Sequence, residues 1–191
     1  MGNIPESAGL SSFNLLDQEA FFHALDIKSG MTILDLGCGL GNYAITFSQY
    51  VGETGLIQGF DLWEEGIEIL NTRAAVAQIT NIRADVVDVC KKIPIEDQCV
   101  DLCLLATVVH NLIHEKNIQN VLTEVRRVLK PGGVIAIVEF KKMGGPAAGP
   151  PLSQRHSPLE LEKILASHNL HMIKSLDVGQ YNYLSIFSVV S

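Results

Sequence analysis

The sequence predicts an α/β fold, a Rossmann-like doubly wound sheet of seven mostly parallel strands that ends in an antiparallel hairpin and carries helices on both faces. Short, nearly continuous apolar runs alternate with longer amphipathic segments, and such runs are typical of strands covered on both sides. Strand–helix–strand units repeated in this way form right-handed doubly wound sheets. The tail over 170–190 breaks the alternation, because two strand-like runs follow each other there.

The apolar runs predict strands at 31–36, 56–60, 100–105 and 134–138, and a weaker run predicts another at 82–89. Amphipathic patterns predict helices at 18–25, 42–50, 64–77 and 117–129. The last of these should end at Lys130-Pro131-Gly132-Gly133, since proline cannot continue a helix and glycine turns sharply. Residues 143–157 are rich in proline and glycine and predict a loop.

The C-terminal part opens with a helix start signal. Ser157-Pro158-Leu159-Glu160 has the form of a capping box with proline at the first helical position, and it predicts a helix over 158–168. Two strands within 170–190, joined through 177–180, would complete the sheet as an antiparallel hairpin.

Composition limits what the chain can be. Of 191 residues, 47% are apolar and 18% charged, which excludes a disordered chain. The net charge of −7 gives no footprint for a nucleic-acid backbone. The longest apolar stretch, 100–113, is too short and polar to span a bilayer, and the first ten residues lack signal-peptide features. We therefore expect a soluble, cytoplasmic protein without integral membrane association, whose four cysteines are free thiols.

The most informative segment is Asp35-Leu36-Gly37-Cys38-Gly39-Leu40-Gly41-Asn42, where a strand ends, three glycines alternate and a helix begins. Open parallel sheets bind ligands at this crossover, and glycine lets a ligand touch the backbone. The G-x-G-x-G spacing departs from the dinucleotide fingerprint, and no lysine follows as in a P-loop. Asp35 would repel a pyrophosphate and suits a cationic group. A tight turn without a ligand is the alternative.

A second acidic residue, Asp61, follows Gly41 by twenty residues at the end of the second predicted strand. A carboxylate at that point can accept both hydroxyls of a ribose diol. The alternative is a helix-capping aspartate before Glu64-Glu65.

Together these motifs resemble class I S-adenosylmethionine-dependent methyltransferases. The closer resemblance, over about residues 15–140, is to the group that contains ubiquinone/menaquinone C-methyltransferases and arsenite methyltransferases. The residues that carry it are 33–41, Asp61, Asp88, Asp101 and Arg127-Val128-Leu129-Lys130-Pro131-Gly132-Gly133. It implies S-adenosyl-L-methionine as cofactor, S-adenosyl-L-homocysteine as product and methyl transfer to a small-molecule acceptor. The absence of cysteine from the last third of the chain weakens the interpretation as an arsenite methyltransferase, which uses several thiolates near the cofactor.

The resemblance also implies roles for residues around the methionine and ribose parts of the cofactor. Gly37, Gly39 and the backbone between them at Cys38 would cradle these parts. Asp35 would hold or orient the ammonium group, directly or through water. Asp61 would take the ribose hydroxyls.

Other residues are implied at the adenine and the reacting end. Leu62 would pack on the adenine, Asp88 would accept its amino group, and the Val89 backbone N–H would face the ring. Asp85 competes with Asp88 for this role. Ala106 would lie beside the reacting end of the cofactor.

Candidate residues for the acceptor follow the fourth strand and the proline-rich loop. His110 is the first choice for a general base, since an ordinary histidine titrates near pH 6.5; a structural or substrate-shaping histidine is the alternative. Arg155 could bind an anionic group of the acceptor, or lie solvated in its loop. His110 and His114 lack a third ligand, so no metal is expected.

We expect one domain over 1–191, with 1–28 as an N-terminal helix or lid, 143–157 near the acceptor, and a monomer or homodimer. An NAD-dependent oxidoreductase and a non-catalytic S-adenosylmethionine-binding module are the competing functions.

Overall fold

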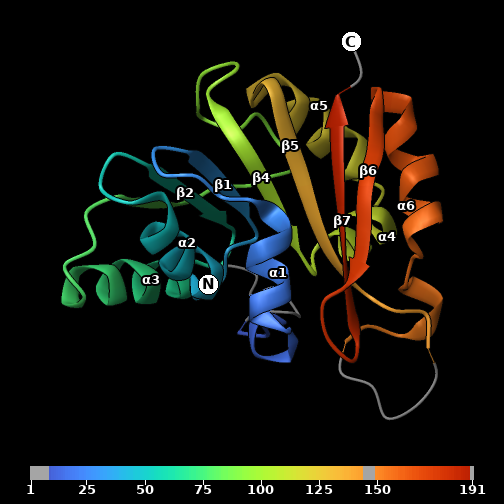
Figure 1. Ribbon diagram of the computed structural model, residues 1–191, viewed down its shortest axis with the longest axis horizontal. Coiled ribbons are helices and arrows are strands. Elements are labelled where there is room, and N and C mark those ends of the chain that lie inside the picture. Colours follow the sequence, from blue (N-terminus) through green and yellow to red (C-terminus); the bar gives the residue numbers. More distant parts are fainter. Residues whose placement is uncertain (1–8, 144–148, 190–191) are drawn as a thin grey trace.

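The computed structural model describes residues 9–143 and 149–189, which form a seven-stranded sheet in the order β3-β2-β1-β4-β5-β7-β6 (Figure 1). Strands β1 to β5 run parallel, and β7 lies antiparallel between β5 and β6. The predicted fold class is therefore confirmed. The strands are β1 Thr32–Leu36, β2 Leu56–Asp61, β3 Ile82–Val86, β4 Val100–Ala106, β5 Leu129–Phe140, β6 Leu170–Asp177 and β7 Asn182–Val189.

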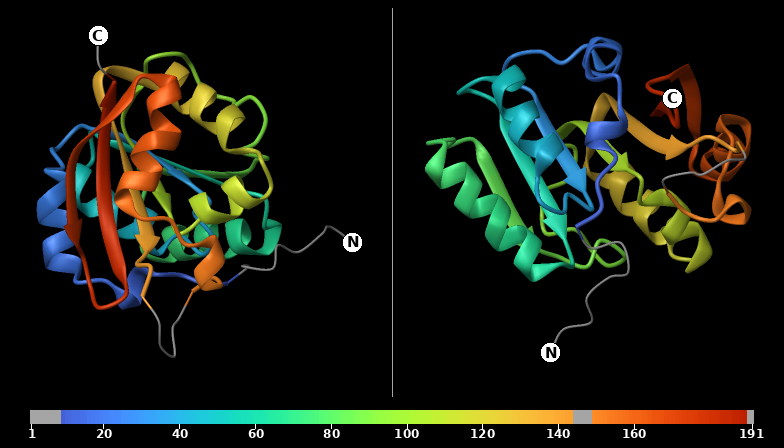
Figure 2. Two further views of the ribbon diagram at one scale, coloured as in Figure 1. Left: turned by 90° about the vertical axis from the view of Figure 1, so that its right-hand side faces the viewer. Right: turned by 90° about the horizontal axis from the view of Figure 1, so that it is seen from below.

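Helices cover both faces of the sheet. Figure 2 shows α1 on one side and α5 and α6 on the other. On the first side lie α1 (Gln18–Leu25), α2 (Asn42–Val51) and α3 (Glu64–Val76), and on the second α4 (Val109–His114), α5 (Ile118–Val128) and α6 (Pro158–Leu165). The 3₁₀ turns are η1 (Phe13–Leu15), η2 (Leu152–Gln154) and η3 (Ala166–His168).

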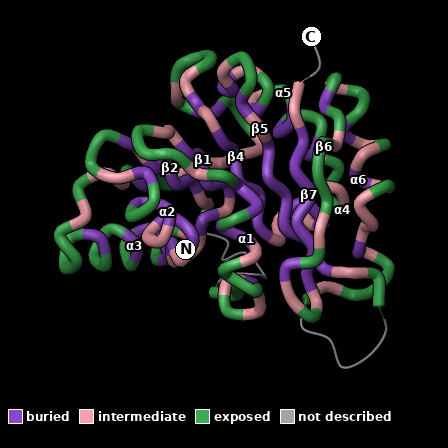
Figure 3. The backbone as a smooth tube through the Cα atoms, in the orientation of Figure 1, coloured by how far each residue is buried: buried purple, intermediate pink, exposed green. Residues whose placement is uncertain are grey.

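The central strands carry two apolar cores, one on each face. Neighbouring residues of a strand point to opposite faces, so Ile33 packs with the α1–α3 layer and Leu34 with the α4–α6 layer. Both side chains are fully buried, and Figure 3 shows that buried backbone follows the middle of the sheet. Burial on both sides explains why these strands read as continuous apolar runs.

Two strand boundaries differ most from those expected, and the helix expected over 158–168 ends at Leu165, where η3 follows. β3 ends at Val86 rather than at 89, because its pairing with β2 ends where Asp61 meets Val86. β5 begins at Leu129 rather than at 134, and its register with β4 shifts after Val100. The Lys130–Gly133 turn is thus an irregularity within a strand. The capping box is confirmed, since the Ser157 side chain accepts a hydrogen bond from the Glu160 N–H and the Glu160 side chain accepts one from the Ser157 N–H.

The segment before α1 crosses the carboxyl ends of the strands. Ser12 Oγ lies 2.7 Å from the Tyr43 hydroxyl of α2, and the Asp17 N–H donates to the Val178 carbonyl beyond β6 at 2.9 Å. The Phe13 ring packs edge-on against Tyr43 at 5.1 Å. The lid over 1–28 stays a prediction, and its first eight residues, like 144–148 of the loop at 143–157, lie outside the described ones.

Within the described ranges, no helix is long and apolar enough to cross a membrane.

Candidate functional site

Backbone hydrogen bonds fix the glycine loop to the end of β2. The Gly37 and Cys38 N–H groups both donate to the Phe60 carbonyl, at 2.7 and 3.2 Å. A Cβ at Gly37 would lie 2.5 Å from a methyl group of Val108, so this glycine is required by close packing. At Gly39 a Cβ would meet nothing within 4 Å. The Gly39 backbone therefore borders open space, as a backbone that touches a ligand must.

Asp61, the last residue of β2, holds the glycine loop through hydrogen bonds. Its Oδ2 accepts the Gly39 N–H at 2.8 Å, and its Oδ1 accepts the Trp63 N–H at 2.9 Å. Helix α3 has Trp63 at its N-cap and no side-chain cap, so the alternative of a helix-capping Asp61 is wrong. Each carboxylate oxygen can accept a further hydrogen bond, which leaves Asp61 available to a ligand. The adjacent Leu62 side chain is 53% exposed and free to pack against a flat ligand.

Asp35 is the most unusual group at this end of the sheet. It is 1% exposed, and its Oδ2 has no hydrogen-bond partner. Burial, and secondly the charge of Asp61, raise the pKa of Asp35 to about 7. A buried carboxyl without a partner is unfavourable, and a cationic ligand beside it would remove that cost.

The segment after β3 runs beside Asp61. The Val87 N–H donates to the Asp61 carbonyl at 3.0 Å, and Asp88 and Val89 follow, half-buried. Asp85, by contrast, lies within β3 and is exposed. The fold therefore brings Asp88 and Val89 to the same edge as the glycine loop, which favours Asp88 over Asp85 for the predicted adenine contact.

The end of β4 turns sharply into α4 at the same edge. Ala106 is buried and pairs with Val138 of β5. The next residue, Thr107, has a φ of 55°, and its N–H donates to the Val138 carbonyl at 2.8 Å. Its hydroxyl lies 3.4 Å from Ser12 Oγ. Ala106 thus lies where the strand ends meet the N-terminal segment.

His110 pairs with a carboxylate that sequence reasoning missed. Its Nδ1 lies 3.0 and 2.9 Å from the two oxygens of Glu139 in β5. The backbone N–H groups of His110 and Phe140 also donate to this carboxylate. Glu139 is 1% and His110 6% exposed. The available signal was a single charge in the otherwise apolar run 134–140.

Arg155 is buried, so the alternative of a solvated loop arginine is wrong. It is 4% exposed, and its guanidinium donates to the carbonyls of Pro150 at 2.9 Å and Lys141 at 3.1 Å. It also lies over the Phe140 ring, 5.5 Å from the centroid. Arg155 therefore holds the loop beside His110, and a contact with the acceptor stays a prediction.

The cysteines are free thiols, as expected. Burial raises the pKa of Cys38 and of Cys103, and it raises that of Cys90 to about 11. These thiols are therefore neutral at physiological pH. In the parts of the chain that the structure describes, no three potential metal ligands come together.

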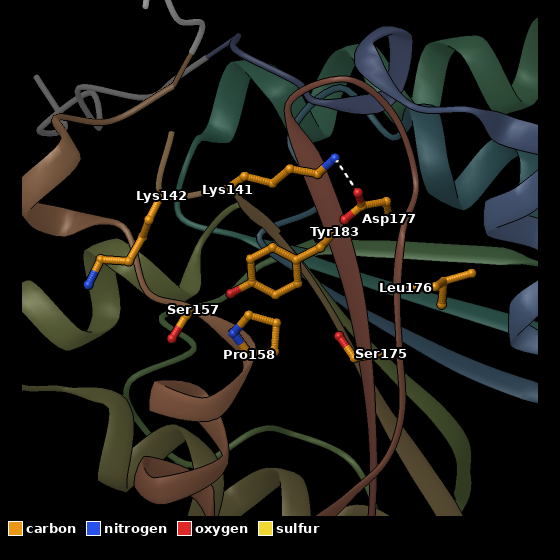
Figure 4. A pocket seen from close by; sticks show the side chains of 8 residues that line it. All are labelled: Lys141, Lys142, Ser157, Pro158, Ser175, Leu176, Asp177 and Tyr183. Atoms are coloured by element: carbon orange, nitrogen blue, oxygen red, sulfur yellow. Dashed lines mark ion pairs between the residues drawn. The ribbon is translucent and has the colours of Figure 1, made fainter. Parts of the chain in front are cut away.

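A hollow of about 400 Å³ lies just beyond the carboxyl end of β5, between β6, β7 and the start of α6 (Figure 4). Two of its lining residues pair with each other, Lys141 with Asp177 at 2.8 Å, and Lys142 pairs with Glu160 outside the lining at 2.8 Å. None of the residues predicted for the cofactor lines it. The candidate site therefore lies at the glycine loop and not in this hollow.

The fold defines a Rossmann-like domain, and its candidate site lies at the carboxyl ends of β1, β2 and β4, next to the crossover at which open sheets bind ligands. Residues 27–178 match the family described as a methyltransferase domain, and the chain belongs to that family. The family gives no support to the oxidoreductase alternative.

Curated relatives match over part of their length. The 2-phytyl-1,4-naphtoquinone methyltransferase of Nostoc punctiforme is 36% identical over 123 residues, which are 62% of this chain and 50% of the relative. The ubiquinone/menaquinone biosynthesis C-methyltransferase UbiE of Erwinia tasmaniensis is 27% identical over 169 residues, 83% of this chain and 59% of the relative. The chain spans about half the length of the curated relatives it matches.

A solved structure matches over nearly the whole chain. A SAM dependent methyltransferase from Aquifex aeolicus superimposes with a TM-score of 0.84 at 28% identity, and the match covers 98% of this chain and 95% of that one. The [4+2]-cyclase SpnF superimposes with a TM-score of 0.69 at 22% identity, covering 85% of this chain and 59% of that one. The second likeness shows the fold alone, and chemistry must be argued from the site.

Proposed function

We propose that this chain is an S-adenosylmethionine-dependent methyltransferase that acts on a small-molecule acceptor. The observation that carries the proposal is the unpartnered, buried Oδ2 of Asp35 beside the open backbone of Gly39. An anionic pyrophosphate would be repelled there, whereas an amino-acid ammonium would supply the missing hydrogen-bond donor and charge.

The remaining cofactor contacts would come from residues at the same carboxyl edge of the sheet. Asp61 would accept the ribose hydroxyls with the lone pairs that Gly39 and Trp63 leave free. Leu62 would cover the adenine, and Asp88 with the Val89 N–H would contact its rim. Bound there, S-adenosylmethionine supplies a methyl group on a positively charged sulfur that already is a good leaving group.

The acceptor would lie between Ala106, His110 and the loop held by Arg155. Its positioning there supplies most of the rate, because the leaving group needs no further activation. His110 would take a proton from an acceptor that has one to lose. The names of the relatives suggest a naphthoquinol ring as the first acceptor class to test.

Binding is tested first, by isothermal titration and by the fluorescence of Trp63, the single tryptophan. Trp63 follows Asp61 and Leu62 directly, so a nucleoside bound there should change its emission. We expect saturable binding of S-adenosylmethionine and S-adenosylhomocysteine, and none of NADH. No binding of either sulfur nucleoside at about 1 mM would overturn the proposal, and binding of NADH alone would restore the oxidoreductase.

Turnover is tested next, with S-adenosylmethionine labelled in the methyl group. The acceptors are reduced 1,4-naphthoquinone, catechol, a thiol and arsenite. We expect labelled product from the ring hydroxyl compounds. Cofactor binding without transfer to any of them would favour the non-catalytic module.

A further inference from the structure

The buried pair of Glu139 and His110 is a feature that cofactor binding does not use. Glu139 comes from β5 and His110 from the first turn of α4, and among the described residues Glu139 has no lysine or arginine partner. Its partners are the His110 ring and the backbone N–H groups of His110 and Phe140. An apolar side chain would pack this position without the cost of burying a charge, so the carboxylate serves something other than packing.

The geometry dictates which imidazole nitrogen carries the proton. Only Nδ1 lies within hydrogen-bond distance of the carboxylate, at 2.9 and 3.0 Å from its two oxygens. A carboxylate accepts and does not donate, so Nδ1 must carry the hydrogen. In the neutral ring Nε2 is then left with a lone pair, and it has no hydrogen-bond partner in the residues that the structure describes.

The carboxylate itself cannot rotate away. The His110 N–H donates to Oε1 at 3.1 Å and the Phe140 N–H to Oε2 at 3.3 Å, so each oxygen has a fixed backbone donor. The Phe140 ring lies edge-on to His110, with centroids 6.4 Å apart, and Arg155 covers Phe140 in turn. The imidazole is therefore oriented by the carboxylate and by its ring neighbour.

We propose that Glu139 is a positioning residue that holds His110 as the Nδ1–H tautomer, so that Nε2 accepts a proton from the methyl acceptor. This inference rests on the proposed function and narrows its substrate class. The acceptor is one that loses a proton, such as a ring hydroxyl or the carbon beside it, rather than a tertiary amine or a thioether. The acceptor forms its bond to the methyl carbon as the carbon–sulfur bond breaks, the electron pair of that bond stays on sulfur, and the acceptor's proton goes to Nε2.

The tautomer is tested without turnover. ¹⁵N NMR of the full chain labelled in histidine is recorded at pH 8 with S-adenosylhomocysteine present, and the His110 signal is assigned by its loss in His110→Asn. We expect a protonated Nδ1 and an unprotonated Nε2. A His110 that carries its proton on Nε2, or on both nitrogens, would overturn the proposal whatever the fate of the methyltransferase assay.

The variant Glu139→Gln tests the effect on catalysis. The amide keeps the size of the side chain but can present its N–H₂ to Nδ1, which then moves the proton to Nε2. With reduced 1,4-naphthoquinone we expect kcat to fall about 10²–10⁴-fold, with cofactor affinity within twofold. Glu115→Gln, an exposed glutamate at the end of α4, is the matched control and should behave as the parent chain.

Two further readouts separate positioning from a structural role. The defect of Glu139→Gln should shrink for acceptors whose hydroxyl is already ionised at the assay pH, and the double variant Glu139→Gln/His110→Ala should be no slower than His110→Ala alone. Additive defects, or an equal loss for every acceptor, would refute the positioning role. If the parent chain transfers no methyl group at all, the proposed function fails and the NMR result still decides the tautomer.

Discussion

Because its pKa is raised, Asp35 should make the stability of the protein and its affinity for the cofactor depend on pH in opposite ways. Its pKa rises from 3.8 to about 7 because the folded chain buries it. Between these two values the unfolded chain loses the Asp35 proton before the folded protein does. Stability should therefore fall as the pH rises from about 4 to about 7, and remain at the lower level above that.

The magnitude follows from the two pKa values. One pKa unit corresponds to about 1.4 kcal/mol, so charged Asp35 costs up to about 4 kcal/mol above pH 7. That is a large part of the ~5–15 kcal/mol that stabilises a domain. Asp35→Asn should remove this cost, with a gain in unfolding free energy near zero at pH 4 and up to about 4 kcal/mol at pH 8.

The same variant should bind the cofactor poorly. The ionised carboxyl is the form that an ammonium prefers, so in the parent chain affinity for S-adenosylmethionine should fall as the pH drops below about 7. S-adenosylhomocysteine has the ammonium but no sulfonium, and Asp35→Asn should weaken both ligands equally. A loss confined to S-adenosylmethionine would place Asp35 at the sulfur instead.

The assay is urea unfolding followed by circular dichroism at pH 4, 6 and 8, together with titration of both ligands. Asp85→Asn, an exposed aspartate in β3, is the control and should change neither property. If Asp35→Asn shows the same pH dependence of stability as the parent chain, folding does not raise the pKa of Asp35, and the reasoning is refuted.

Four further variants test the glycine loop, the ribose site and the loop held by Arg155. Gly39→Ala should cost about 1 kcal/mol of stability for its positive φ and reduce cofactor affinity at least tenfold. Gly41→Ala, whose Cβ would lie 2.1 Å from Leu70, should chiefly lower the melting temperature. The opposite pattern would show that the Gly39 backbone does not contact the cofactor. Asp61→Ala should weaken S-adenosylmethionine binding by about 1.5–3 kcal/mol, and calorimetry showing unchanged affinity would exclude Asp61 from the ribose site. Arg155→Met should destabilise the protein by about 2–4 kcal/mol, since buried carbonyls lose charged donors. A variant with the same melting temperature as the parent chain would show that the loop does not depend on this guanidinium.

The sequence alone determined the alternation of strands and helices, the glycine loop and the capping box at Ser157, because each is a local pattern whose cause lies within a few residues. A strand buried on both faces must be apolar throughout, and a helix start needs acceptors for its free N–H groups. Asp35 and Asp61 were recognisable for the same reason, since their spacing from the glycines places them at strand ends.

The tertiary structure alone decided which side chains meet. His110 and Glu139 are 29 residues apart, and they pair because β4 and β5 are parallel neighbours that end at the same edge. Arg155 is buried only because its loop folds back over Phe140. Such contacts depend on strand order and register, which no short stretch of sequence encodes, because a side chain's partner is set by where the backbone of a distant element passes.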